Sequence, residues 1–136
     1  MVKYMKPNNI DHIAIAVANI DDATKLYNQL LNAEPQHIEE VVDQKVMTAF
    51  YPIGDSSVEL LAPTSDESPI AKFIAKNGTG MHHIAFKVSD IEKTLKELKD
   101  RGFRLIDETP RQGAGGKKIA FVHPKSTGGV LIEVCE

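Results

Sequence analysis

The sequence predicts an α+β protein made of two paired βαβββ modules that form a curved mixed sheet. Three observations lead to this fold class. The sequence His-Ile-Ala occurs in residues 11–17 and again in residues 82–88, at an offset of 71 positions (83 − 12). Each copy alternates as a strand does and is followed by the start signal of a helix. Each half then returns to strands, and because a unit of about 60 residues buries little surface by itself, we expect the halves to share one core.

The first repeated segment, residues 11–17, has two different faces. The odd-numbered positions from 13 to 17 are bulky and apolar, so we expect this face to pack under a helix. His12 lies on the other face, whose remaining positions are alanines. Small side chains beside a histidine leave room for a cavity.

A helix and three strands are expected next. Asn19 suits the N-cap of a helix, with Asp21 and Asp22 in its first turn. The predicted apolar stripe of this helix comprises Ala23, Tyr27, Leu30 and Leu31. Strands are predicted over residues 36–41, 46–53 and 57–62, with the turn Gly54-Asp55-Ser56 between the last two.

A short helix over residues 69–76 joins the halves. Ser68 and Pro69 provide an N-cap and a proline at the first helical position. The predicted apolar stripe is Ile70, Phe73 and Ile74, and Asn-Gly-Thr-Gly at 77–80 ends the helix. We therefore expect one domain over residues 1–136, made of modules at about 8–66 and 79–136.

The second half repeats the order of elements. Ser89-Asp90-Ile91-Glu92 predicts a capping box that begins at Ser89, and Gly102 suits the end of the helix. The predicted apolar stripe comprises Ile91, Leu95 and Leu98. Strands are expected over 103–106, 118–122 and 130–134, with residues 124–129 between the last two.

Composition excludes several classes of protein. Apolar residues make up 42% of the chain and charged residues 26%, as in ordinary soluble globular proteins. A net charge of −3 argues against general nucleic-acid binding. A single cysteine, Cys135, excludes an internal disulfide framework and fits a reducing compartment. Residues 1–9 lack a signal core and no apolar run approaches the roughly 20 residues of a membrane span, so we expect a cytoplasmic protein that binds neither nucleic acid nor membrane.

Two histidines and two glutamates correspond across the repeat. His12 matches His83, and Glu59 matches Glu133 at an offset of 74 (133 − 59). Each glutamate interrupts an apolar strand, where an unpaired buried carboxylate is costly and a divalent cation removes the cost. Taken singly, each residue could belong to an exposed strand face or an ordinary core. Together they favour a metal-containing cleft that holds Co, Ni, Mn, Zn or Fe and leaves positions open for water or substrate oxygens.

The same segments resemble the vicinal oxygen chelate superfamily and, within it, the methylmalonyl-CoA epimerase family, over about residues 8–136. The His-Ile-Ala strands are specific only to the superfamily. The stretch from Lys117 to Lys125, with its His-Pro-Lys ending, and Gly-Val-Leu-Ile-Glu at 129–133 are more particular to the epimerases. Segments 58–63 and 68–73 also carry the likeness. The resemblance implies a homodimer and the metal ligands His12, Glu59, His83 and Glu133.

The implied activity is that of an isomerase that interconverts the 2R and 2S forms of methylmalonyl-CoA. A base removes the α-proton from one face and an acid returns a proton to the other, through an enediolate that a divalent metal ion (Co, Mn, Ni or Zn) stabilises. Some relatives are thought to use a glutamate on the strand that corresponds to residues 46–51. That strand has no carboxylate here, and the aligned position is Thr48. We therefore expect Glu133 to act as both ligand and base, with the second proton carrier unassigned.

Basic residues near the end of the chain are candidates for substrate binding. The loop over residues 111–118 is glycine-rich and basic but lacks the ending and spacing of a P-loop. We expect Lys117, Lys118 and Lys125 to contact the carboxylate or the phosphates of an acyl-CoA, although a mobile connection between strands is the alternative for this loop. His123, just before Pro124, is a further candidate at the mouth of the cleft.

Three other functions fit parts of the pattern. A glyoxalase I (lactoylglutathione lyase) would share the fold and a similar ligand set, but its usual Asp-Pro-Asp-Gly ending differs from residues 124–129. A non-catalytic small-molecule binding protein on the same fold would lack the ligand set. An extradiol dioxygenase would hold iron with two histidines and one carboxylate. The fourth ligand and the short chain disfavour it.

Overall fold

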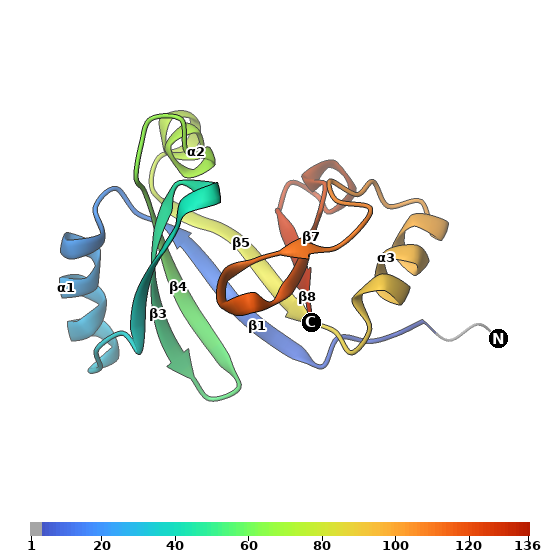
Figure 1. Ribbon diagram of the computed structural model, residues 1–136, viewed down its shortest axis with the longest axis horizontal. Coiled ribbons are helices and arrows are strands. Elements are labelled where there is room, and N and C mark those ends of the chain that lie inside the picture. Colours follow the sequence, from blue (N-terminus) through green and yellow to red (C-terminus); the bar gives the residue numbers. More distant parts are fainter. Residues whose placement is uncertain (1–3) are drawn as a thin grey trace. The chain divides into compact units, whose positions relative to one another are not determined.

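The computed structural model describes residues 4–136 (Figure 1). Residues 1–3, which belong to the segment expected to lack a signal core, lie outside the described residues. None of the helices in the described part is long and apolar enough to cross a membrane. The helices are α1 (Ile20–Leu31), α2 (Pro69–Asn77) and α3 (Ile91–Asp100), with three short 3₁₀ turns at Val42–Gln44, Ala114–Gly116 and Pro124–Ser126. The strands are β1 (Asn9–Ala16), β2 (His37–Val41), β3 (Val46–Ile53), β4 (Ser56–Pro63), β5 (Gly80–Lys87), β6 (Arg111–Gln112), β7 (Lys118–Val122) and β8 (Ile132–Cys135).

The chain divides into two compact units. The N-terminal module is His12–His82, and the C-terminal module is the segment that ends at Asp11 together with His83–Glu136. Their strand orders are β2-β3-β4-β1 and β6-β7-β8-β5, so the topology is the same. In both modules the first strand runs parallel to the last, and the remaining pairs are antiparallel. These mixed sheets confirm the α+β class and the repeated βαβββ order.

Helix α1 begins where the sequence predicts. The side chain of Asn19 accepts a hydrogen bond from the backbone N–H of Asp22 at 3.0 Å. The helix covers the bulky face of the N-terminal sheet, where Ile15, Val17, Leu60 and Tyr51 pack against Ile20, Ala23, Tyr27 and Leu31. The sheet therefore has one face closed by α1 and one face left for other contacts.

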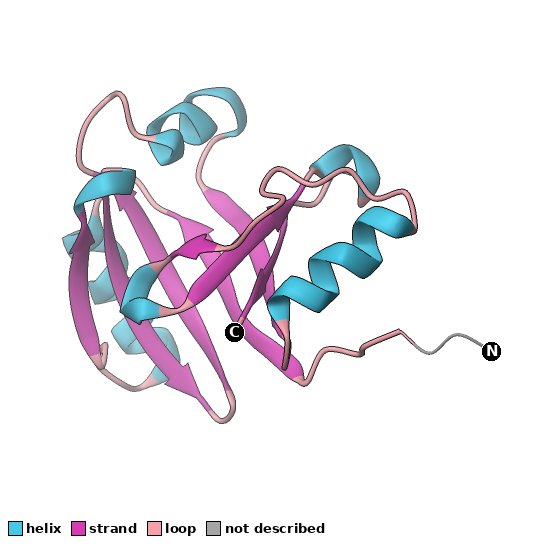
Figure 2. Cartoon of the chain, turned by 45° about the vertical axis from the view of Figure 1, so that its right-hand side comes forward, coloured by secondary structure: helices cyan, strands magenta, loops and turns pink. Residues whose placement is uncertain are grey.

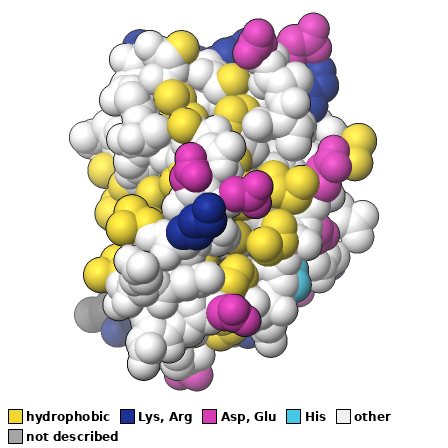
Figure 3. All heavy atoms as spheres, turned by 90° about the vertical axis from the view of Figure 1, so that its left-hand side faces the viewer, with side chains coloured by type: hydrophobic (Ala, Val, Ile, Leu, Met, Phe, Trp, Pro, Cys, Tyr) yellow, Lys and Arg dark blue, Asp and Glu magenta, His cyan; other side chains and the backbone are white. Residues whose placement is uncertain are grey.

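The predicted stripe of α1 is wrong at Leu30, which is 69% exposed. The stripe that packs on the sheet comprises buried Ala23 and half-buried Ile20, Tyr27 and Leu31. Leu30 lies outside it, as does Leu26, which is 62% exposed. Figure 3 views the side of the molecule on which α1 lies and shows exposed hydrophobic side chains among charged ones.

Helix α2 covers the other face of β1. The hydroxyl of Ser68 accepts the backbone N–H of Ile70 at 3.1 Å and Pro69 opens the helix, as predicted. The apolar side of α2 packs against residues that include Ala14 and Ala16. The open space expected beside these two alanines is therefore filled by the helix, because their small side chains let α2 approach closely.

Helix α3 starts one residue later than the predicted capping box. Asp90, not Ser89, is the N-cap, and its carboxylate accepts the backbone N–H of Lys93 at 3.1 Å. The hydroxyl of Ser89 instead hydrogen-bonds the side chain of Asn8 at 3.2 Å. Gly102 follows the helix with φ +90°, as expected, and the helix buries Ile91 and Leu95 against the C-terminal sheet.

The strand predicted over residues 103–106 does not form. The segment makes an isolated bridge between Leu105 and Val122, and Figure 2 draws a loop there. The carboxylate of Asp107 accepts the backbone N–H of Phe121 at 2.9 Å, which removes a donor that a continuous ladder would need. The side chain thus interrupts the pairing that the apolar pattern favours.

The last two strands follow the prediction more closely. β7 spans Lys118–Val122, as predicted, whereas β8 begins at Ile132 instead of Val130. Gly128 and Gly129 have φ values of 73° and 98°, so the chain is still turning when the apolar run begins.

Candidate metal centre and active site

The N-terminal module brings His12 and Glu59 into contact. In the parallel β1–β4 pair, Ala14 lies beside Glu59, so the glutamate projects from the same face as His12. The Nδ1 atom of His12 lies 3.1 Å from Oε2 of Glu59. The two residues are only 6% and 7% exposed. A buried carboxylate therefore has an imidazole as its neighbour.

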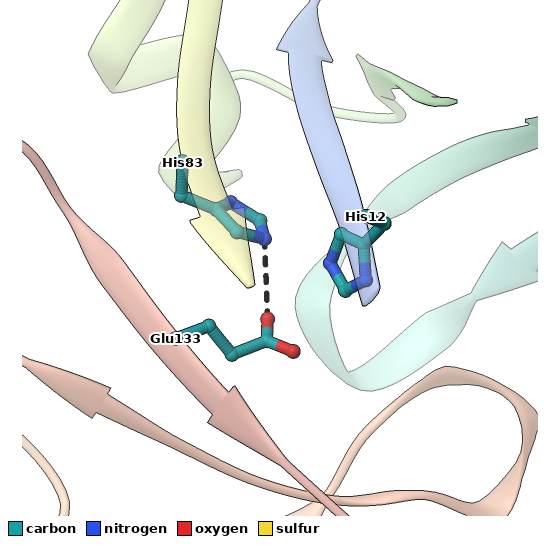
Figure 4. Close-up of side chains that lie close together, drawn as sticks. All are labelled: His12, His83 and Glu133. Atoms are coloured by element: carbon teal, nitrogen blue, oxygen red, sulfur yellow. Dashed lines mark ion pairs between the residues drawn. The ribbon is translucent and has the colours of Figure 1, made fainter. Parts of the chain in front are cut away.

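The C-terminal module repeats this contact with His83 and Glu133. Ala85 lies beside Glu133 in the parallel β5–β8 pair, which places the glutamate on the face of His83. The Nε2 atom of His83 lies 3.1 Å from Oε1 of Glu133, and Figure 4 draws this ion pair as a dashed line. The residues are 6% and 4% exposed.

The donor atoms in each pair suit a divalent metal ion. Imidazole nitrogen and carboxylate oxygen bind metals such as zinc at about 2.0–2.2 Å, so two ligands at a right angle lie about 3 Å apart. The 3.1 Å separations of His12 from Glu59 and of His83 from Glu133 match that spacing. Both pairs also belong to groups of side chains with ligand atoms close enough to hold an ion. The residues therefore fit the metal that the sequence implies.

A phenylalanine lies directly across from each glutamate, which the sequence reading did not single out. Phe50 is the β3 partner of Glu59, and Phe121 is the β7 partner of Glu133. The ring of Phe121 meets that of His83 edge-on, with centroids 5.3 Å apart. The two phenylalanines are 71 positions apart (121 − 50), the same offset as the histidines. This shared offset is the feature of the sequence that could have identified the two phenylalanines as equivalent residues of the repeat.

Strand β3 has no carboxylate at the position of Thr48, but the adjacent strand β2 carries one, on Glu39. Thr48 is buried in β3, and its hydroxyl donates to the backbone carbonyl of Glu39 at 3.0 Å. Glu39 is the β2 partner of Thr48, so its side chain projects from the same face of the sheet. Its carboxylate lies 3.8 Å from Nε2 of His37, and that ring stacks on Phe50.

Lys117, one of the three predicted substrate-binding lysines, forms an ion pair with Asp11 of the same module. Its ammonium lies 3.0 Å and 2.8 Å from the two carboxylate oxygens of Asp11, which is buried. Cys135 is nearby and buried, and its desolvation together with the charges of Asp11 and Glu133 raises the pKa of its thiol to about 12. The thiol therefore stays protonated at neutral pH and is a poor nucleophile.

The other basic candidates lie at the surface of the C-terminal module. Lys118 lines a cavity of about 420 Å³ together with Arg111 and Glu92. Lys125 is exposed, and its backbone N–H donates to Nδ1 of His123 at 3.0 Å. Desolvation and the positive charges of Arg104 and Lys125 hold the pKa of His123 below its ordinary value.

The remaining histidine, His82, packs its ring against Phe73 of α2, with centroids 4.8 Å apart. It follows that adjacent histidines of β5 have different neighbours, as the alternation of a strand requires.

Comparison with known proteins identifies the family. Residues 11–121 match the glyoxalase/bleomycin resistance protein/dioxygenase superfamily. The chain is 40% identical to the mitochondrial methylmalonyl-CoA epimerase of Dictyostelium discoideum, over 93% of this chain and 77% of the relative. The crystal structure of methylmalonyl-CoA epimerase from Mycobacterium tuberculosis superposes with a TM-score of 0.91 at 37% identity, over 100% of this chain and 92% of the other.

A second solved structure is a methylmalonyl-CoA epimerase in complex with methylmalonyl-CoA and NH4+. It matches with a TM-score of 0.88 at 36% identity and covers 96% of this chain and 94% of the other. The fold, the extent of these matches and their identities agree with one another. The chain therefore belongs to the methylmalonyl-CoA epimerases, which are isomerases within the glyoxalase/bleomycin resistance protein/dioxygenase superfamily.

Proposed function

We propose that this protein interconverts the 2R and 2S forms of methylmalonyl-CoA and that its two His–Glu pairs together hold one divalent cation. The observation that carries the proposal is the repeated 3.1 Å contact between a buried histidine and a buried glutamate at equivalent positions of the two modules. Membership of the epimerase family supports the reaction, and the donor set supports Co, Mn, Ni or Zn as the metal.

Each module would supply half of the ligand set. His12 and Glu59 come from the N-terminal module, and His83 and Glu133 from the C-terminal module. When bound, a divalent cation would supply Lewis-acid stabilisation of negative charge on the oxygens of the substrate. Its positive charge would also offset the cost of keeping the two carboxylates away from water.

Glu133 is the proposed base. The hydrogen at C2 of methylmalonyl-CoA lies between a thioester carbonyl and a carboxylate, so both groups delocalise the charge left by its removal. Glu133 is buried beside His83, and a carboxylate can serve as the general base that takes a proton from carbon. Inversion at C2 requires that a proton return to the opposite face, which calls for a second proton carrier that is distinct from Glu133.

The substrate is proposed to be an acyl-CoA with an anionic acyl group. The relative with bound methylmalonyl-CoA supports this class of substrate. Lys118 and Lys125 are exposed and are the proposed contacts for the phosphates of coenzyme A. Lys117 precedes Lys118, and 38% of its side-chain surface is exposed, so it is proposed as a third contact. A homodimer is proposed by analogy with the family.

The test is proton exchange at C2. Single-stereoisomer methylmalonyl-CoA is incubated with the protein in deuterated buffer and followed by NMR, before and after treatment with a chelator and after cobalt is restored. We expect deuterium to enter C2 as the other stereoisomer appears, both processes to stop on chelation, and both to return with cobalt. Turnover only of the methylglyoxal–glutathione adduct would instead indicate a glyoxalase. Binding of either compound without turnover would indicate a sequestering protein.

A further inference from the structure

His123 lies on the same face of the C-terminal sheet as the proposed base. Phe121 is directly opposite Glu133 in the antiparallel β7–β8 pair. His123 directly follows β7 and its backbone is extended, with φ −64° and ψ 135°, so we apply the alternation of the strand to this next position as well. This alternation would place the imidazole, like Phe121, on the face that carries Glu133 and His83.

The hydrogen bond to His123 fixes where its proton lies. The backbone N–H of Lys125 donates to Nδ1 at 3.0 Å, so Nδ1 must carry a lone pair. A neutral ring in this position holds its proton on Nε2. Within residues 4–136, Lys125 is the hydrogen-bond partner that the structure gives this imidazole. Nε2–H is therefore the hydrogen-bond donor of the neutral ring.

The surroundings of His123 keep the ring neutral. Arg104 and Lys125 place positive charge beside it, and the backbone carbonyl of Arg104 accepts the N–H of His123 at 2.9 Å, which holds the two residues together. Desolvation disfavours a positive charge on the ring, and both side chains would repel it. A neutral imidazole with a protonated Nε2 cannot accept a proton there, so His123 is unsuited to act as the second base.

We propose that His123 is an electrophilic residue of the epimerase reaction, whose Nε2–H donates a hydrogen bond to the thioester carbonyl oxygen of the substrate. This inference rests on the proposed function and adds to it a contact that stabilises the substrate. Negative charge grows on that oxygen as Glu133 removes the proton from C2. A preorganised donor stabilises the charge, and the proton stays on Nε2 throughout.

The first experiment compares three variants in the deuterium-exchange assay at saturating cobalt. His123→Ala removes the donor, His123→Gln restores an amide N–H near the position of Nε2, and Lys76→Ala is a control on an exposed side chain of α2. Loss of one such donor costs about 10²-fold in kcat. We expect that loss for His123→Ala with KM within about threefold, partial recovery for His123→Gln, and no change for Lys76→Ala. The pH profile of kcat should keep both of its limbs in His123→Ala, since His123 does not transfer the proton.

The second measurement determines which nitrogen of the His123 ring carries the proton. ¹⁵N NMR of the imidazole in the wild-type protein at pH 7–8 should show a protonated Nε2 and an unprotonated Nδ1. A protonated Nδ1, or an active His123→Ala with wild-type kcat, would overturn the proposal. If His123→Ala fails to fold, equal loss of kcat in a folded His123→Gln and in a folded His123→Phe would count against a donor role, and recovery only in His123→Gln would support it. A wild-type protein that exchanges no deuterium would overturn the epimerase function itself, and this inference with it.

Discussion

The ammonium of Lys117 bridges both carboxylate oxygens of Asp11, at 3.0 Å and 2.8 Å. Asp11 is 8% exposed and lies in β1 immediately before His12. Lys117 follows three glycines of the loop that precedes β7. The contact therefore ties a glycine-rich loop to the strand that carries a proposed metal ligand.

Replacement of Lys117 by alanine should lower the free energy of unfolding by about 1–3 kcal/mol. The buried carboxylate of Asp11 loses the ammonium that lies 2.8 Å from one of its oxygens. Urea unfolding followed by circular dichroism measures the effect. Lys125→Ala is the control, because its exposed side chain should contribute less than about 0.5 kcal/mol. Equal stabilities of the two variants would show that the Lys117–Asp11 contact does not stabilise the fold.

The start of α3 gives a second prediction. Because Asp90 accepts the backbone N–H of Lys93, Asp90→Ala should lower the free energy of unfolding by about 1 kcal/mol. Ser89→Ala removes only an exposed hydrogen bond to Asn8 and should cost less than about 0.5 kcal/mol. Thermal or urea unfolding of the two variants compares them directly. The reverse order of stabilities would place the cap at Ser89, as the sequence pattern first indicated.

The repeat explains why most of the fold was predictable from sequence. His12 and His83 mark equivalent strands, so recognition of one offset gave both modules their order of elements. Local caps such as Asn19 and Ser68 depend on one side chain and its nearby backbone, and both were predicted. The segment at 103–106 depends on Asp107, whose carboxylate competes for a backbone donor 14 residues away. The pattern of apolar residues in the sequence therefore cannot show that Asp107 takes this donor from the strand.

The site was less completely predictable, because cross-strand neighbours depend on register. The apolar context of Glu59 and Glu133 indicated buried carboxylates, and the structure buries both. The offset of Phe121 from Phe50 repeats that of the histidines, but its place opposite Glu133 needed the β7–β8 register, and Glu39 emerged only with the β2–β3 register. The tautomer of His123 likewise depends on a turn that brings the N–H of Lys125 back to the ring. Such relations arise from backbone geometry and not from the spacing of residue types.

The pKa of His123 should rise when its cationic neighbour is removed. Desolvation and the positive charges of Arg104 and Lys125 lower this pKa, so Arg104→Gln should move it toward the ordinary value near 6.5. An NMR titration of the ring measures both proteins. Since the pKa is lower in the folded state, the contribution of His123 to stability is present above the unfolded pKa and is lost as the pH falls through the folded value. Wild-type protein should therefore lose more stability than Arg104→Gln on acidification through that window. An unchanged pKa in the variant would remove Arg104 as a cause.

The last prediction separates the two roles proposed for Glu133. Glu59 and Glu133 make matching 3.1 Å contacts with histidine, so Glu59→Gln and Glu133→Gln should weaken cobalt binding by similar factors, about 10- to 100-fold. Only Glu133 is proposed to take the proton from C2. At cobalt concentrations that saturate both variants, we expect Glu133→Gln to lose about 10²–10⁴-fold in the rate of deuterium entry, because general base catalysis contributes that much, and Glu59→Gln to lose far less.

Cobalt content is measured by its visible absorption, and exchange by NMR on the same samples. This pairing matters because an apparent loss of catalysis would otherwise include a loss of metal. Equal exchange rates in the two saturated variants would show that Glu133 has no role beyond that of Glu59, and the base would then have to be sought on another strand. Glu39, which projects from the same face as Thr48, would be the first residue to substitute in that search.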